Sequence, residues 1–197
     1  MKFIKFVAFL LLSLLVVPVA YSASDSWELD KAHSNVYFSI DHIFSKVNGN
    51  FNDFSTEIVF NPDDLGKSRF VFTINVDSIN TNISKRDKHL LSADFFDEGK
   101  YSTMTFTSTS VTAGDGGLYN VAGKLTVKGK DYDLTLPLVL AGVKDHPAVP
   151  GKEVAGFNGT VVIDRLVHGV GGGKFYKMGV VGKDVEIFVS LEVTRSK

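Results

Sequence analysis

Hydrophobic and polar residues alternate with a period of two along nearly the whole chain after its first 25 residues. Segments 36–40, 70–76, 134–140 and 185–193 place Val, Ile, Leu or Phe at almost every second position. This alternation is typical of β-strands with one buried face, because successive side chains point to opposite sides of a sheet. Turn-forming pairs such as Asn48-Gly49 and Gly116-Gly117 separate the segments.

The number and spacing of these segments predict the fold class. Together with segments 27–30, 51–60, 104–106, 119–127 and 157–163 they make about eight or nine strands joined by short connections. Helical segments do not alternate with the strands, so the sheet is expected to be antiparallel and the fold to be an all-β barrel or sandwich. No linker, repeat or change of composition divides residues 23–197. We therefore predict a single domain of about eight strands.

One segment, residues 82–92, interrupts the alternation. It is polar and can form a helix, and helical spacing would place one group of residues on a common side. These residues are Ile83, Arg86, Asp87, Leu90 and Leu91. We predict a short helix that lies over one end of the barrel, with Ile83, Leu90, Leu91, Phe95 and Phe96 facing inward. Arg86 and Asp87 either form a structural ion pair, or Arg86 contacts the head group of a ligand.

The N-terminal segment has the pattern of a secretory signal peptide. Lys2 and Lys5 precede an apolar run that ends at Pro18, and Ala20 and Ser22 fit the small-residue rule for cleavage. A membrane anchor is the alternative, but the apolar run is short for a spanning helix, which needs roughly 20 residues. We predict a signal peptide at 1–22, a mature domain at 23–197 that does not span the membrane, and a periplasmic location.

Charge and cysteine content exclude several classes of function. The formal net charge is −1, and removal of Lys2 and Lys5 makes it −3, because no acidic residue lies before Asp25. Nucleic-acid binding needs a basic face, so a nucleic-acid partner is not expected. The chain has no cysteine, which excludes thiol catalysis, thiolate metal sites and disulfides.

An ordered series of short motifs extends through almost the whole mature chain. The series is Trp27-Glu28-Leu29-Asp30, His33-Ser34-x-Val36-x-Phe38, Gly49-x-Phe51, Ser78-Ile79-x-Thr81, Arg86-Asp87-x-His89-Leu90, Ser92-Ala93-Asp94-Phe95-Phe96-Asp97, Gly123-x-Leu125-Thr126-x-x-Gly129, and Gly156-Phe157 followed by Arg165 and Gly169. The series resembles the YceI-like family of polyisoprenoid-binding proteins. The resemblance implies a lipocalin-like antiparallel barrel that holds a long isoprenoid or similar amphiphile in its bore, and export to the periplasm. The chain departs from the family pattern at Leu166, Val167 and His168, where a locally different loop is expected.

The candidate ligand-binding residues are those on the inward-facing positions of the predicted strands and on the inner side of the helical insert. They are Phe38, Ile40, His42, Phe51, Phe72, Ile74, Arg86, Leu90, Phe96, Met104, Phe106, Leu125, Leu136, Leu138, Phe157, Arg165 and Ile187. From the residues alone, the same side chains could fill a small barrel as an ordinary core. His42 is either a core-edge histidine bonded to the backbone or a ligand contact, and Arg165 either binds a phosphate or hydroxyl head group or forms a salt bridge.

Catalytic, metal and cofactor motifs are not recognised in the sequence. The five histidines lack the spacing of a metal site, and no G-x-S-x-G motif or catalytic acid pair is recognised. The glycine-rich segment 169–174 lacks the spacing of a phosphate loop, and no helix is expected after it. The leading hypothesis is a non-catalytic lipid carrier without cofactor or metal. A stress-related or structural interaction module with a solid barrel, and a lipid enzyme with unrecognised catalytic residues, are the alternatives. A homodimer is left open.

Overall fold

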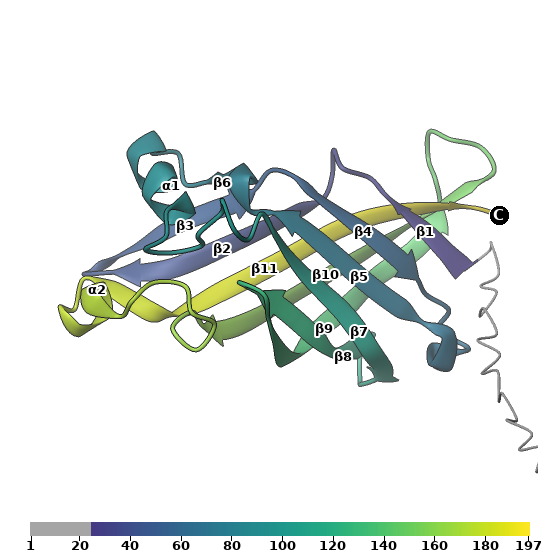
Figure 1. Cartoon of the computed structure of the whole chain (residues 1–197). Coiled ribbons are helices and arrows are strands. Elements are labelled where there is room, and N and C mark those ends of the chain that lie inside the picture. Colours follow the sequence, from purple (N-terminus) through teal and green to yellow (C-terminus); the bar gives the residue numbers. More distant parts are fainter. Residues whose placement is uncertain (1–24) are drawn as a thin grey trace, which may run out of the picture.

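The alternating segments form β-strands of a single antiparallel sheet that closes on itself (Figure 1). The computed structural model describes residues 25–197; the predicted signal peptide at 1–22 lies outside them. The strands are β1 (Ser26–Leu29), β2 (Asn35–His42), β3 (Ser45–Phe51), β4 (Phe54–Val59), β5 (Arg69–Asn75), β6 (Ile79–Asn80), β7 (Thr103–Ala113), β8 (Leu118–Val127), β9 (Lys130–Asp145), β10 (Lys152–Asp164) and β11 (Val181–Ser196). The α-helices are α1 (Ser84–Leu91) and α2 (Lys174–Lys177), and single 3₁₀ turns occur at Leu65–Lys67 and Val76–Ser78.

The strand order closes a barrel. Neighbouring strands follow the order β1-β4-β5-β7-β8-β9-β10-β11, and β1 also pairs with β11, which completes the ring. The N-terminal part of β11 pairs instead with β2, and β3 and β6 continue the wall from there. The predicted all-β, lipocalin-like antiparallel barrel of about eight strands is therefore confirmed.

One half of the barrel interior is filled by aromatic and aliphatic side chains. Phe60, Phe70 and Phe157 are fully buried, and their rings meet at centroid distances of 5.2–5.9 Å. Trp27 packs in the same core, where its indole N–H donates a hydrogen bond of 3.2 Å to the carbonyl of Phe60. We call this part the filled half. Because it has a dense core of its own, it can stabilise the barrel whatever the other half contains.

The helical insert forms as predicted, with differences at its edges. Helix α1 spans Ser84–Leu91, and Leu90 and Leu91 pack against the core. Ile83, predicted to face inward, is instead exposed to solvent. It precedes the first helical turn with an extended backbone, so the helical spacing used to group it with Leu90 does not apply to it.

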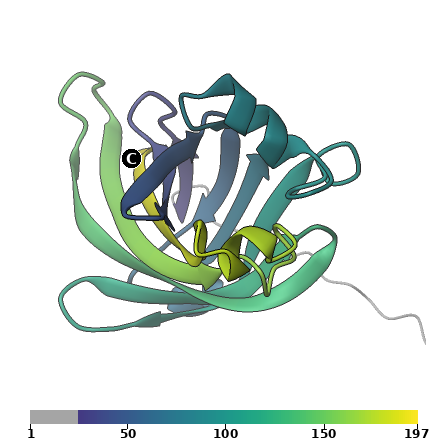
Figure 2. The same cartoon turned by 90° about the vertical axis from the view of Figure 1, so that its left-hand side faces the viewer.

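A second helix was not expected from the sequence. Helix α2 follows the glycine-rich segment directly, and Gly173 before it has a φ of 75°. Glycine adopts this left-handed conformation without steric cost, so it allows the chain to turn into a single helical turn. Both helices lie at the same end of the barrel, which Figure 2 views directly.

Candidate ligand-binding site

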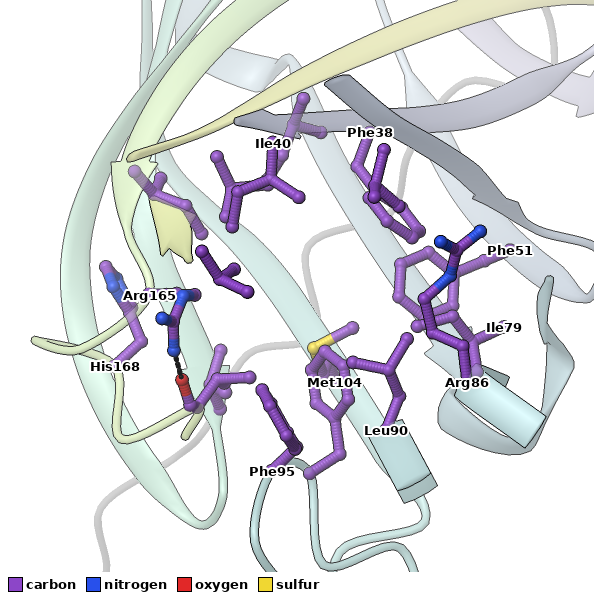
Figure 3. Close-up of a pocket in the computed structure, with 18 of the residues that line it drawn as sticks. Phe38, Ile40, Phe51, Ile79, Arg86, Leu90, Phe95, Met104, Arg165 and His168 are labelled. Carbon is purple, nitrogen blue, oxygen red and sulfur yellow. Dashed lines mark hydrogen bonds between the residues drawn. The ribbon is translucent and has the colours of Figure 1, made fainter. Parts of the chain in front are cut away.

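The end of the barrel that carries the two helices contains a pocket. Its volume is about 330 Å³, and its wall consists mainly of apolar side chains from β2, β3, β8 and β11, helix α1 and the segment around α2 (Figure 3). The strands place alternate side chains inward, which explains the apolar lining. We call this part of the barrel the pocket half.

Most of the residues predicted to bind a ligand line this pocket. They are Phe38, Ile40, His42, Phe51, Ile74, Arg86, Leu90, Phe96, Met104, Leu125, Arg165 and Ile187. Strands β2, β5, β7, β8 and β11 contribute through their inward faces, and Leu90 and Phe96 reach the pocket from α1 and the segment after it. Figure 3 shows Leu90, Phe95 and Met104 on the side of the pocket opposite Ile40. That these side chains bind a ligand remains a prediction.

The remaining predicted residues do not line the pocket. They are Phe72, Phe106, Leu136, Leu138 and Phe157, which belong to the buried core. Phe72 and Phe106 pack on one another with ring centroids 6.1 Å apart. The alternation of a strand tells which face of the sheet a side chain is on, but not how far along the bore it lies. Depth along the bore separates these residues from those of the pocket half.

Several lining residues were missed. Val47, Val127, Ile163 and Val185 line the pocket from strands whose alternation could have identified them. Ile79 also lines it, but β6 has only two residues and shows no alternation. His89, which helical spacing placed away from the inner side, also contacts the pocket. By contrast, His168, Val170 and Phe175 reach it from the loop and helix after β10, where the sequence has no periodic signal.

A glycine on the neighbouring strand leaves room for the ring of Phe38. Phe38 on β2 is paired with Gly49 on β3, and a Cβ atom on Gly49 would lie 2.4 Å from Cζ of the Phe38 ring. A residue with a side chain at this position would displace the ring. The ring also packs against Phe51 at a centroid distance of 5.7 Å. Phe38 and Phe51 together form an aromatic part of the pocket wall.

Thr81 holds α1 in place through Arg86 and Asp87. The buried Thr81 hydroxyl accepts a hydrogen bond of 2.7 Å from Arg86 Nε, and the Thr81 carbonyl accepts one of 2.7 Å from Arg86 Nη2. The Thr81 N–H and hydroxyl both donate to Asp87 Oδ1. No ion pair joins Arg86 directly to Asp87 in the described chain, so the predicted structural pair is corrected to an indirect one through Thr81.

Arg165 is buried beside the pocket and binds backbone carbonyls rather than a carboxylate. Its Nε donates to the Gly182 carbonyl and its Nη1 to the Val170 carbonyl, both at 2.8 Å. Its Nη2 is buried without a hydrogen-bond partner among the described residues. Burial lowers the pKa of this guanidinium below its usual value, and the charge of Asp164 acts in the opposite direction. The predicted alternative, a salt bridge of Arg165, is not formed. Arg165 instead links the loop after β10 to strand β11.

A glycine makes room for this link. Gly171 has a φ of 88°, and a Cβ atom there would lie 2.4 Å from Arg165 Nη1. The loop that departs from the family pattern at Leu166–Val167–His168 is thus closed over a buried cation. His168 itself is buried, with its Nδ1 2.8 Å from the Asp164 carbonyl and its ring 4.4 Å from that of Tyr132.

The pocket holds few groups able to take part in chemistry. The described residues that line it include no aspartate, glutamate, serine, threonine or lysine. Asp30, His33 and Glu192, whose potential ligand atoms lie within 4.8 Å of one another, could together hold a metal ion. They do not line the pocket, and the His33 side chain is largely exposed. The pocket can therefore surround an apolar molecule but offers few groups to activate one.

Within residues 25–197, no helix is long and apolar enough to cross a membrane. Strands supply nearly all of the secondary structure there.

Comparison with known proteins agrees with the observed barrel. A UPF0312 protein of Pectobacterium atrosepticum is 34% identical over 194 residues, which cover 95% of this chain and 97% of that protein. A UPF0312 protein of Vibrio cholerae is 33% identical over 163 residues, which cover 81% of this chain and 85% of that protein.

Solved structures are also similar. Burkholderia cenocepacia BcnA has a TM-score of 0.74 at 28% identity, over 84% of this chain and 99% of that one. A Campylobacter jejuni YceI protein has a TM-score of 0.69 at 32% identity, over 86% and 97%. A Saccharophagus degradans domain described as polyisoprenoid-binding shares the fold, with a TM-score of 0.60 at 16% identity over 87% and 98%. The model of the YceI-like domain matches residues 27–193, and the chain therefore belongs to the YceI-like family.

Proposed function

We propose that this protein binds a long-chain amphiphilic lipid of the polyisoprenoid class in the pocket half and carries it without catalysing a reaction. The observation that carries this proposal is the apolar cavity of about 330 Å³ next to a fully packed core. Small-molecule sites typically measure about 300–1,000 Å³. An interaction module with a solid barrel, the alternative function, would need the pocket half to be filled as well.

The polar groups at the pocket indicate which part of the lipid enters it. The pocket wall is mainly apolar, and Arg86 and Arg165 each donate two hydrogen bonds within the protein. Arg165 Nη2 is the one buried donor there without a partner among the described residues. An isoprenoid tail needs no such donors, and burial contributes about 0.8 kcal/mol per CH₂ group before ordering costs. We infer that the tail occupies the pocket and that the polar head group remains near its opening.

The family supports a binding role. The resemblance to polyisoprenoid-binding proteins agrees with the apolar lining, and the lack of a carboxylate or an aliphatic hydroxyl among the described lining residues supports a non-catalytic function. Met104, which lines the pocket, has a flexible thioether that can adapt to a mobile tail.

The proposal is tested by extraction of the purified protein with organic solvent, followed by mass spectrometry. We expect an isoprenoid or similar long-chain lipid in stoichiometric amount. Met104→Trp should fill the pocket and reduce the lipid recovered, whereas Val143→Trp, on an exposed position of β9, should not. A purified protein that contains no lipid, and that takes up no polyprenol from detergent, would show that the proposal is wrong.

We also propose that residues 1–22 act as a signal peptide and that the mature protein is periplasmic. The basic start, the apolar run and the small residues Ala20 and Ser22 support this proposal. N-terminal sequencing of the protein from a bacterial periplasmic fraction should begin at or near Ala23. Recovery of intact Met1 in the membrane fraction would contradict it.

A further inference from the structure

We propose that the pocket end of the barrel docks on the surface of an anionic lipid bilayer, so that the bound lipid passes between membrane and pocket. Transfer of a lipid at the membrane presupposes the proposed carrier function. The residues that support docking, however, differ from those that line the pocket. These residues surround the opening and do not bind the tail.

Exposed apolar side chains gather on the segments around the pocket opening. We call them the mouth rim: Ile43, Phe44, Val167, Tyr176 and Met178, all exposed to solvent. Phe44 is fully exposed at the tip of the β2–β3 turn, and Met178 directly follows α2. A single exposed apolar side chain is ordinary, but several around the opening of an apolar pocket indicate an interaction surface.

Hydrogen bonds and contacts show that these segments lie close together. The Ile43 N–H donates to the Val180 carbonyl at 3.0 Å, which joins the β2–β3 turn to the segment after α2. A Cβ atom on Gly173, at the start of α2, would lie 3.8 Å from the Leu166 side chain, next to Val167. Figure 2 looks directly onto this end and shows α2 beside the β2–β3 turn.

The backbone of the β2–β3 turn keeps two apolar residues exposed at a steric cost. Ile43 has a φ of 54°, a left-handed conformation that is rare for a β-branched residue. Asparagine or glycine would adopt it more easily and would not expose an apolar side chain. Strain of this kind is retained where the conformation serves a function, and here it presents Ile43 and Phe44 to the solvent at the pocket opening.

Four lysines on the two helices at this end are available to an anionic surface. Lys85 and Lys88 on α1 and Lys174 and Lys177 on α2 are exposed, and none of them forms an ion pair within the described chain. Aromatic and aliphatic side chains beside lysines are typical of segments that bind at the interface of an anionic membrane.

A second copy of this chain is a poorer occupant than a bilayer. In a symmetric dimer formed through this end, both subunits would bring the lysines of α1 and α2 into the same interface, where like charges repel. A bilayer supplies anionic head groups for the lysines and an apolar interior for the mouth rim. It also lets an apolar tail enter the pocket with little exposure to water, which would otherwise oppose its transfer.

The test measures binding of the purified protein to vesicles by flotation. Vesicles of phosphatidylglycerol and phosphatidylethanolamine should retain the protein, and vesicles of phosphatidylcholine alone should retain much less. Phe44→Ser should weaken binding about tenfold, because burial of this side chain is lost. Val167→Ser should weaken it less. Val143→Ser, at a valine on β9 that is 45% exposed compared with 63% for Val167, is the matched control and should have no effect.

Fluorescence gives a second measurement. The chain contains one tryptophan, Trp27, which is buried in the filled half. Phe44→Trp therefore adds a probe at the mouth rim, and its emission should shift to shorter wavelength on addition of the anionic vesicles. Val143→Trp should show no shift. The double variant Lys174→Gln, Lys177→Gln should weaken the preference for phosphatidylglycerol, because only Lys85 and Lys88 of the four lysines remain.

Three results would overturn the proposal. The first is no retention by either kind of vesicle, and the second is an equal effect of Phe44→Ser and Val143→Ser. The third is light scattering that shows a dimer dissociated by Phe44→Ser, which would assign the mouth rim to a second copy. Lipid extraction separates this proposal from the proposed function. If the protein contains lipid but does not bind vesicles, only the docking proposal is refuted. If it binds vesicles through Phe44 but never contains lipid, only the carrier function is refuted.

Discussion

Phenylalanines in the two halves of the barrel should respond differently to truncation. Phe157 is completely buried, with the rings of Phe60 and Phe70 edge-on at centroid distances of 5.2 and 5.6 Å. Phe38 packs on Phe51 but also lines the pocket, so part of its ring faces the cavity. Phe157→Ala and Phe38→Ala remove the same atoms and therefore form a matched pair.

The structure gives the expected size of each effect. Truncation of a buried phenylalanine costs about 3–5 kcal/mol of unfolding free energy, and Phe157 should lie within this range because it is packed on all sides. Phe38 lacks packing partners on its cavity side, so its truncation should cost only about 2 kcal/mol in the lipid-free protein. For a domain of this size each kcal/mol lowers Tm by about 2–4 °C. We expect Tm to fall by about 10 °C for Phe157→Ala and by about half of that for Phe38→Ala.

Urea unfolding of delipidated protein measures the two free energies, and mass spectrometry measures the lipid retained before delipidation. Phe38→Ala should lose much of its lipid, because an apolar wall of the pocket is removed. Phe157→Ala should keep its lipid as long as it is folded. Equal losses of unfolding free energy would refute the division into a filled half and a pocket half, as would loss of lipid in Phe157→Ala alone.

Three further predictions concern the insert, the loop after β10 and the pH dependence of stability. Thr81→Val should remove the hydrogen bonds of the hydroxyl with Arg86 Nε and Asp87 Oδ1 and leave only those of the Thr81 backbone. It should cost about 1–3 kcal/mol and speed hydrogen exchange in α1. Lys88→Gln is the control, and unchanged exchange in α1 would show that the Thr81 hydroxyl does not hold the helix. Gly171→Ala should destabilise the protein by about 1–3 kcal/mol through its positive φ and its contact with the Arg165 guanidinium. Gly172→Ala, where a Cβ atom meets nothing within 4 Å, should be neutral in the same thermal unfolding assay. The hydrogen bond that His33 donates to the Asp30 carboxylate raises the pKa of His33 above its usual value. The stabilisation from this bond is therefore complete below about pH 6.5 and is lost as the pH rises through the folded pKa. The urea midpoint should fall over that range in the wild type and stay flat in His33→Gln, and parallel curves would contradict the assignment.

The pattern of side chains determined the strands and the character of the barrel. Period-two alternation predicted the faces that point inward at Phe38, Ile74 and Ile187, because the pleat of a strand is a local property of the backbone. The break in this alternation similarly predicted α1. The order of the motifs was sufficient to suggest the family, which the family model then matched over residues 27–193.

Only the tertiary structure decided where along the bore the interior is empty. Phe72 and Ile74 share a face of β5, yet the first lies in the core and the second lines the pocket. Their difference depends on the side chains that the other strands place at the same depth, and no local pattern records this. The role of Arg165 was hidden for a similar reason. Arg165 binds the carbonyl of Gly182, 17 residues away, and the pairing of β10 with β11 brings these groups together. Thr81 is only five and six residues from Arg86 and Asp87, but the spacing of the residues does not record which side chains its hydroxyl binds.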